Sequence, residues 1–238
     1  MLISKKDWLR YIRRLSAIDK KAADAMQYWM DENPGASVEE LIYTANLLAD
    51  RYGEAAASLA CAMYDATALA QGATLPPAEP AEVATYQETA KAIQGTLKNE
   101  RNSVPATVGR LVKQAGADTM LKNARRDGAE WAWVPMGDTC SFCIMLASRG
   151  WQRQSKTDHA EHIHANCDCT YAVRFDGRSG VRGYDPEKYL AMYEAGDPGS
   201  DNWQDKLNGM RRADYARRAD EINEQKRIAY HARRERET

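Results

Sequence analysis

The N-terminal part of the chain carries the apolar periodicity of two long α-helices. Over residues 5 to about 32, apolar side chains recur every three or four positions, and Lys and Arg occupy much of the opposite face. Ser4 and Ser37 each precede an acidic residue by three positions, which is the spacing of a helix-capping box. The same periodicity continues from Ser37 to about Ala70 after an Asn-Pro-Gly break. We therefore predict an N-terminal helical hairpin over residues 1–72, with a small core of its own.

A proline-rich break and a shorter helix follow the hairpin. Residues 71–81 contain three prolines and no helical periodicity, which is typical of a linker or a domain boundary. Residues 82–100 regain an apolar stripe and then meet a second break at Asn102-Ser103-Val104-Pro105. We predict a proline-rich linker and helix over residues 73–104.

The period of the pattern changes in the middle of the chain. One or two further helices are predicted up to Arg126, and Asp127-Gly128 then signals a turn. Trp131 and Trp133 lie two positions apart, which is strand spacing. A second strand is predicted where five side chains alternate and so share one face, namely Cys167, Cys169, Tyr171, Val173 and Phe175. Residues 105–180 are thus expected to form a small α+β domain.

The C-terminal part, residues 181–238, is expected to form a helical arm. Asp185-Pro186 begins a short helix, and a long polar helix is predicted from Asp201 onward. Between Arg211 and Thr238 there are nine Lys or Arg and six Asp or Glu. This balance fits a solvated helix with alternating charges, and it leaves open a basic arm that contacts phosphate or an acidic protein surface.

Composition limits the classes of protein to which the chain can belong. Its 238 residues carry a formal net charge of -1, so global charge identifies neither a nucleic acid nor a membrane as the partner. No apolar run approaches the ~20 residues that cross a bilayer. The N-terminus is charged where a secretory signal would be apolar. We expect a protein that is made and folded in a cytoplasm.

The cysteines are the most informative residues. Of five, Cys61 stands apart, whereas four cysteines and three of the four histidines fall between residues 140 and 169. In a cytoplasmic protein this clustering favours a metal site over disulfides. Zn²⁺ takes four nitrogen or sulfur ligands in a tetrahedron. The C-x₂-C and H-x₂-C spacings favour Cys140, Cys143, His164 and Cys167 as ligands, with Cys169 as the alternative to Cys167 and His162 as the alternative to His164.

Other interpretations of this cluster stay open at the level of sequence. A disulfide between the two cysteine pairs is one alternative, and unlinked buried thiols are another. His159 and Glu161 match the H-x-E of zinc deaminases, but the cysteine pair comes before this element instead of after it. A zinc-dependent nuclease or hydrolase that acts on nucleic acid is the main enzymatic alternative, with Asp158, His159 or His162 activating water. A site filled by protein ligands favours a structural ion over a catalytic one.

The segments EWAWVPMGDTCSFC and HANCDC resemble the phage Mu F-like minor head proteins, also called phage head morphogenesis proteins. The resemblance covers roughly residues 105–176 and includes Arg125-Arg126 at the end of the preceding helix; Ala165 and Asp168 stand where that family usually has proline and arginine. It implies a minor capsid component near the portal, at low copy number, which in some phages contacts packaged DNA. It also implies a metal-ligand set drawn from Cys140, Cys143, His164, Cys167 and Cys169.

Together these observations predict a mostly α protein with a small α+β zinc-stapled domain, an N-terminal helical hairpin and a charged C-terminal helix. The expected function is structural, in tailed-phage head assembly, and not enzymatic. The expected cofactor is structural zinc. The expected partners are the portal or major capsid protein and, secondarily, packaged double-stranded DNA, with no membrane and no small-molecule substrate. The expected location is the virion, inside the capsid or at the portal vertex. A DNA-binding module that uses the arginine pairs after Arg211 is a third class of function.

Overall fold

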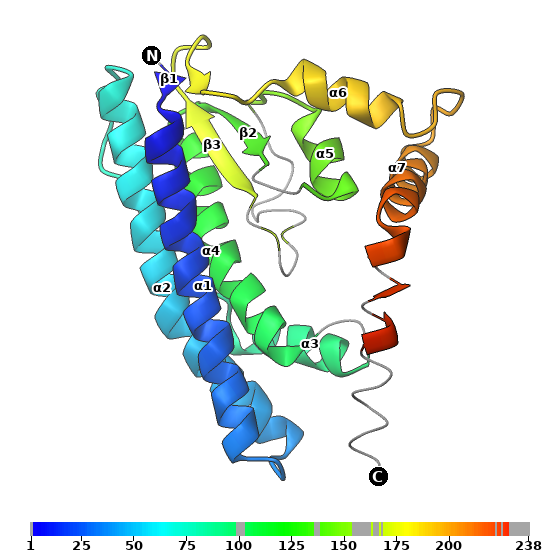
Figure 1. Ribbon diagram of the computed structural model, residues 1–238. Helices are drawn as coiled ribbons and strands as arrows, with labels where there is room; N and C mark the ends of the chain where they lie inside the picture. Colours follow the sequence, from blue (N-terminus) through cyan, green and yellow to red (C-terminus); the bar gives the residue numbers. More distant parts are fainter. Residues whose placement is uncertain are drawn as a thin grey trace. The chain divides into compact units, whose positions relative to one another are not determined.

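Helices dominate the computed structural model of the chain (Figure 1). It describes residues 2–98, 103–135, 139–153, 163, 167, 169–221, 223–224 and 226–228. The chain divides into two units, one of residues 1–139 and 149–184 and one of residues 140–148 and 185–238. The prediction of a mostly α fold with a small amount of sheet is confirmed. None of the helices in the described ranges combines the length and the apolar character needed to cross a membrane.

The helices of the first unit begin close to where the sequence predicts them. They are α1 (Lys5–Glu32), α2 (Val38–Ala70), α3 (Tyr86–Leu97) and α4 (Val104–Arg126). Ser4 accepts a hydrogen bond from the backbone N–H of Asp7, and Ser37 forms a complete capping box with Glu40. These local contacts satisfy backbone donors that the first helical turn leaves without a partner.

The N-terminal hairpin shares its core with α4 instead of having one of its own. Buried side chains of all three helices form one cluster, which includes Trp8, Ile12, Leu15 and Met26 from α1, Ile42 and Ala56 from α2, and Val108 and Val112 from α4. The small residues Ala56 and Gly116 permit this arrangement. A Cβ on Gly116 would lie 3.3 Å from Leu15 Cδ1 and 3.4 Å from the Ala56 carbonyl oxygen. The apolar face of the hairpin is therefore covered by α4, along which α1 and α2 run in Figure 1.

The proline-rich segment is bound along the helices, and we call residues 73–85 the strap. Asn123 of α4 both accepts from the Glu79 backbone N–H (2.9 Å) and donates to the Glu79 carbonyl (2.8 Å). The Arg126 guanidinium donates to the carbonyls of Pro76 and Pro77. Because proline has no N–H and the strap forms no ladder, polar side chains supply the partners that secondary structure would otherwise supply.

Two short β pairs complete the first unit. The strands β2 (Glu130–Val134) and β3 (Thr170–Arg174) are antiparallel, and Trp133 pairs with Tyr171. The strand β3 packs against α2 and α4 and is buried at Thr170, Tyr171, Ala172 and Val173, so both of its faces are covered. It begins at Thr170, so Cys167 and Cys169 precede it; the predicted strand began at Cys167. The strands β1 (Leu2–Ile3) and β4 (Gly180–Val181) form a parallel pair that no sequence pattern indicates. This pair holds the residues just before α1 next to the segment that follows β3.

The second unit consists of α5 (Ser141–Ala147), α6 (Pro186–Glu194) and α7 (Trp203–Arg217). Asp185 caps α6, as the Asp-Pro signal predicts. Gly209 lets α7 approach the end of α6, because a Cβ there would overlap the backbone of Gly196. The helix α7 ends at Arg217, and after a turn at Arg218 the described residues 219–221, 223–224 and 226–228 are helical again, as the predicted long polar helix requires. Only Lys206, Leu207 and Gly209 of α7 are buried.

Candidate metal centre

Three cysteine thiols form the metal-binding candidate. The Sγ atoms of Cys143, Cys167 and Cys169 all lie within 4.8 Å of one another. Cys143 and Cys169 are buried and Cys167 is half-buried. With Zn–S bonds of about 2.3 Å, two sulfurs of one tetrahedral site lie about 3.8 Å apart. Small side-chain adjustments would bring these three thiols to that spacing, so the cluster can hold a metal ion.

The C-x₂-C element forms the start of a helix, which its spacing alone does not indicate. Cys140 is the N-cap of α5, and its Sγ accepts from the Cys143 backbone N–H at 3.5 Å. Cys143 is the third residue of α5 and is fully buried, whereas Cys140 is exposed and is not a member of the three-thiol group. The apolar run Cys143–Ala147 explains the helix, because these side chains are buried only when the segment coils.

The H-x₂-C-x-C element supplies two thiols. The sequence treats Cys167 and Cys169 as alternatives, whereas the structure brings both to the same group. Cys169 directly precedes β3, whose pairing with β2 fixes the backbone there. Next to it, the Trp131 and Trp133 rings both contact the Tyr171 ring edge-on, with centroids 5.1 and 4.8 Å away. Aromatic pairs in this geometry stabilise the strand pair beyond their buried area.

A buried ion pair fixes the backbone at Cys167. The Lys113 ammonium group of α4 lies 2.8 Å from a carboxylate oxygen of Asp19 of α1. It also donates a hydrogen bond to the Cys167 carbonyl. The side chains of Lys113 and Asp19 are 5% and 13% exposed. Burial of a lysine requires such compensation, because an unpaired ammonium is costly to desolvate. No sequence motif indicates this contact, since the three residues lie far apart in the chain.

The remaining predicted site residues have different outcomes. His164, His162, His159, Asp158 and Glu161 lie outside the described residues, so the histidine ligand and the nuclease and deaminase alternatives stay predictions. No disulfide joins the five cysteines in this structure, so the disulfide alternative is not formed in it. Cys61 lies on α2, apart from the cluster, and burial raises the pKa of its thiol.

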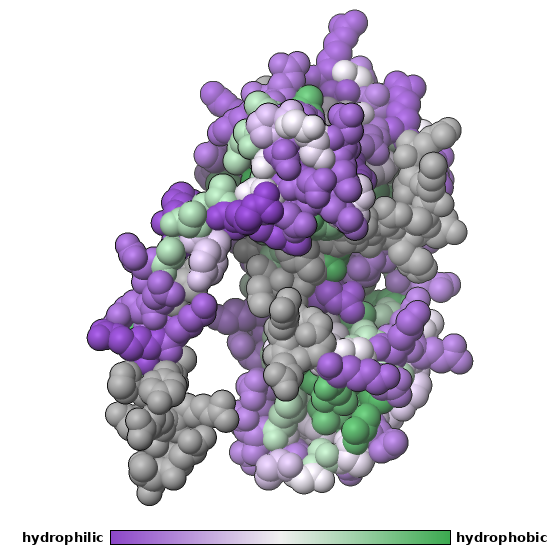
Figure 2. All heavy atoms as spheres, turned by 90° about the vertical axis from the view of Figure 1, so that its right-hand side faces the viewer, coloured by the Kyte–Doolittle hydropathy of each residue, from purple (hydrophilic) through white to green (hydrophobic). Residues whose placement is uncertain are grey.

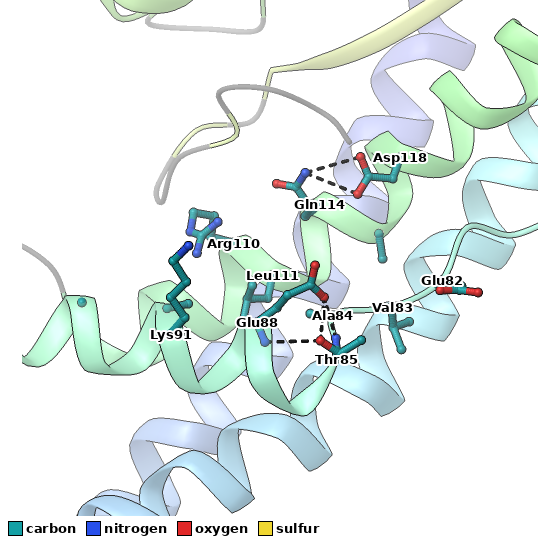
Figure 3. A pocket seen from close by; sticks show the side chains of 13 residues that line it. Glu82, Val83, Ala84, Thr85, Glu88, Lys91, Arg110, Leu111, Gln114 and Asp118 are labelled. Atoms are coloured by element: carbon teal, nitrogen blue, oxygen red, sulfur yellow. Dashed lines mark hydrogen bonds between the residues drawn. The ribbon is translucent and has the colours of Figure 1, made fainter. Parts of the chain in front are cut away.

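Apart from the three-thiol group, a pocket of about 610 Å³ lies between the strap, α3 and α4 (Figure 3). Its charged lining residues are Glu82, Glu88, Lys91, Arg110 and Asp118. Gln114 donates to the Asp118 carboxylate at 3.3 Å, and Glu88 closes the capping box of α3. Burial lowers the pKa of Arg110. Among the described residues, the lining has neither cysteine nor histidine and mixes both signs of charge, so soft-metal chemistry belongs to the three-thiol group instead.

Comparison with known protein families gives one match. The model of the family described as VG15 protein matches residues 2–196, which include both hairpin helices, the strap, the β pairs and all four clustered cysteines. No curated protein and no solved structure matches the chain significantly.

Proposed function

Because this chain belongs to the VG15 family, a family of phage proteins, we propose that it is a structural minor capsid protein that acts in head assembly near the portal. The family match carries the proposal, since it spans residues 2–196 and so covers the helical core together with the cysteine cluster. The role is that of an assembly component of the virion and not of an enzyme. The fold supports the proposal, because most of the described chain forms helices and very little forms sheet, as in an assembly component without an enclosed catalytic site.

The proposed cofactor is one zinc ion with a structural role. Cys143, Cys167 and Cys169 would supply three sulfur ligands, and His164 would supply the fourth, as its H-x₂-C spacing to Cys167 suggests. When bound, such an ion joins its ligands into one rigid unit, and a small sheet of two five-residue strands gains much from a staple of this kind. Four protein ligands leave no coordination position for a reactive water.

The turn end of the hairpin is the proposed docking surface for the portal or major capsid protein. We call Tyr28, Val38, Tyr43 and Leu47 the tip residues; they are 68%, 42%, 59% and 50% exposed. The space-filling view shows that apolar atoms gather near the lower end of one face (Figure 2). Exposed aromatic and aliphatic side chains that cluster on a polar surface are typical of a protein–protein interface.

The test is incorporation into particles. The encoding phage would be complemented with the parent gene or with a variant in which Tyr28, Tyr43 and Leu47 are replaced by Ser. The control replaces Leu190 and Met192 of α6, which are exposed to a similar degree, by Ser. Purified heads would be quantified by mass spectrometry, and each variant would first be shown to retain its helical circular dichroism.

The proposal predicts that the parent and the α6 control enter heads at low copy number relative to the major capsid protein, and that the tip variant stays in the lysate. Absence of the parent protein from purified heads would contradict the capsid role. Normal incorporation of the tip variant would contradict the docking surface alone.

A further inference from the structure

One face of α1 carries a continuous row of cations. At 100° per residue, Lys6, Arg10, Arg13, Arg14, Lys20 and Lys21 fall within an arc of about 120°, opposite the buried face that contains Trp8 and Leu15. All six side chains are exposed, and the first four lie around one shallow surface hollow. Within the chain as a whole, Lys and Arg are balanced by Asp and Glu. The row is therefore a local concentration of positive charge and not a result of overall composition.

These cations are also largely without counter-charges. Among the described residues, Arg10 forms an ion pair with Asp7 at 3.3 Å, and the other five have no ion pair. The C-terminal arm differs, because its cations are matched by acids one turn away. Arg217 pairs with Asp214, Arg218 with Glu221 and Arg227 with Glu224. The charge on α1 is thus available to a partner, whereas much of the charge on the arm is already compensated.

We propose that this face of α1 binds the phosphate backbone of double-stranded DNA without sequence preference. The inference rests on the proposed function, which places the chain in a particle that contains packaged DNA. From Lys6 to Lys21 the helix rises about 22 Å, and a DNA duplex carries about one phosphate charge per 1.7 Å of its axis, so a duplex of that length presents more phosphates than the six cations require. Between Lys6 and Lys21 the face has only Ala17 among its cations, and Asp24 and Tyr28 continue the face towards the end of α1. Protein–protein interfaces are depleted of charge at their core and contain aromatic anchors, so DNA fits the stretch from Lys6 to Lys21 better than an acidic protein does.

The test measures the salt dependence of DNA binding by the full chain. A fluorescent 30-base-pair duplex would be titrated by anisotropy at several salt concentrations. The α1 variant replaces all six cations by Gln, which keeps helix propensity. The matched control has the same net charge as the α1 variant, because it also loses six exposed cations. In it, Gln replaces Arg51, Lys98, Lys188, Arg217, Arg218 and Arg227.

For double-stranded DNA, the slope of log K against log salt changes by about 0.9 for each phosphate contact. The proposal predicts that the α1 variant loses at least about 3 from the magnitude of the slope, while the control loses less than about 1. Equal losses in both variants, undetectable binding of the parent to DNA, or tighter binding of the parent to polyglutamate than to DNA would each overturn it. Failure of the proposed function is distinguishable, because it would appear as absence from purified heads whatever the outcome with DNA.

Discussion

Removal of the Lys113 ammonium group tests how strongly the buried ion pair anchors the helices to the segment that bears the cysteines. In Lys113→Met, the Asp19 carboxylate loses its ion pair with Lys113, and the Cys167 carbonyl loses the hydrogen bond from Lys113. At 2.8 Å and an effective dielectric constant near 20, the gross attraction between the two charges is about 6 kcal/mol. Desolvation offsets part of this attraction. Removal of one partner of a buried pair costs about 3–5 kcal/mol, and the 13% exposure of Asp19 favours the lower end, so we expect a loss of about 3 kcal/mol.

The assay is urea unfolding followed by circular dichroism, applied as a double-mutant cycle. The double variant Asp19→Asn with Lys113→Met removes both charges. We expect its loss in the free energy of unfolding to be about 2 kcal/mol smaller than the sum of the losses of the two single variants. Arg10→Met is the control in the same unit, because Arg10 forms an exposed pair with Asp7 at 3.3 Å. Exposed pairs contribute little, so this control should lose less than about 0.5 kcal/mol. A loss below about 1 kcal/mol for Lys113→Met, or additive effects in the cycle, would refute the argument.

Three further predictions concern the strap, an acidic loop residue and the contact between helices. Asn123→Ala removes both hydrogen bonds between α4 and the Glu79 backbone, so we expect a loss of about 2 kcal/mol and faster proteolytic cleavage within the strap. An unchanged cleavage rate would contradict this prediction. Hydrogen bonds from the backbone N–H groups of Ser179 and Arg178 hold the pKa of Asp176 well below its usual value, so its ionised form stabilises the fold above about pH 4 and this contribution is lost as the pH falls. The Tm of Asp176→Asn should therefore lie below that of the parent at pH 7, and the difference should shrink towards pH 2; a constant difference would oppose this reasoning. Gly116→Val should lower the free energy of unfolding in urea by at least about 2 kcal/mol, because even a Cβ at this position would lie 3.3 Å from a side-chain carbon of Leu15 in α1. A neutral effect would show that α4 can move away from α1.

The helices of the hairpin are predictable from sequence because their signals are local. Ser37 and Glu40 cap α2 through contacts that lie within one turn, and the apolar period marks the buried face of each helix. The two-residue pair of β1 and β4 is different, because Leu2 and Gly180 lie far apart in the sequence and no local pattern links them. The attachment of the strap is equally non-local. Its composition predicts a linker, and nothing in that composition indicates that Asn123 would bind its backbone.

The metal-binding candidate is predictable in part for the same reason. Cysteine spacing points to the segment that contributes to the three-thiol group, and the predicted ligands Cys143 and Cys167 lie in that group. Spacing does not reveal that Cys140 would become a helix N-cap, because that depends on burial of the apolar run after Cys143. Nor does it reveal Lys113, whose role depends on the packing of α1 against α4.

Zinc content of the purified chain tests the three-thiol site most directly. The protein would be expressed in zinc-supplemented medium, purified without chelator, and analysed by inductively coupled plasma mass spectrometry, with free thiols counted in parallel. The site predicts one zinc per chain in the parent and in Cys61→Ser, and less than a tenth of that in Cys169→Ser with its helical circular dichroism retained. A parent that is fully reduced and free of zinc, or a Cys169→Ser variant that keeps its full equivalent, would contradict it.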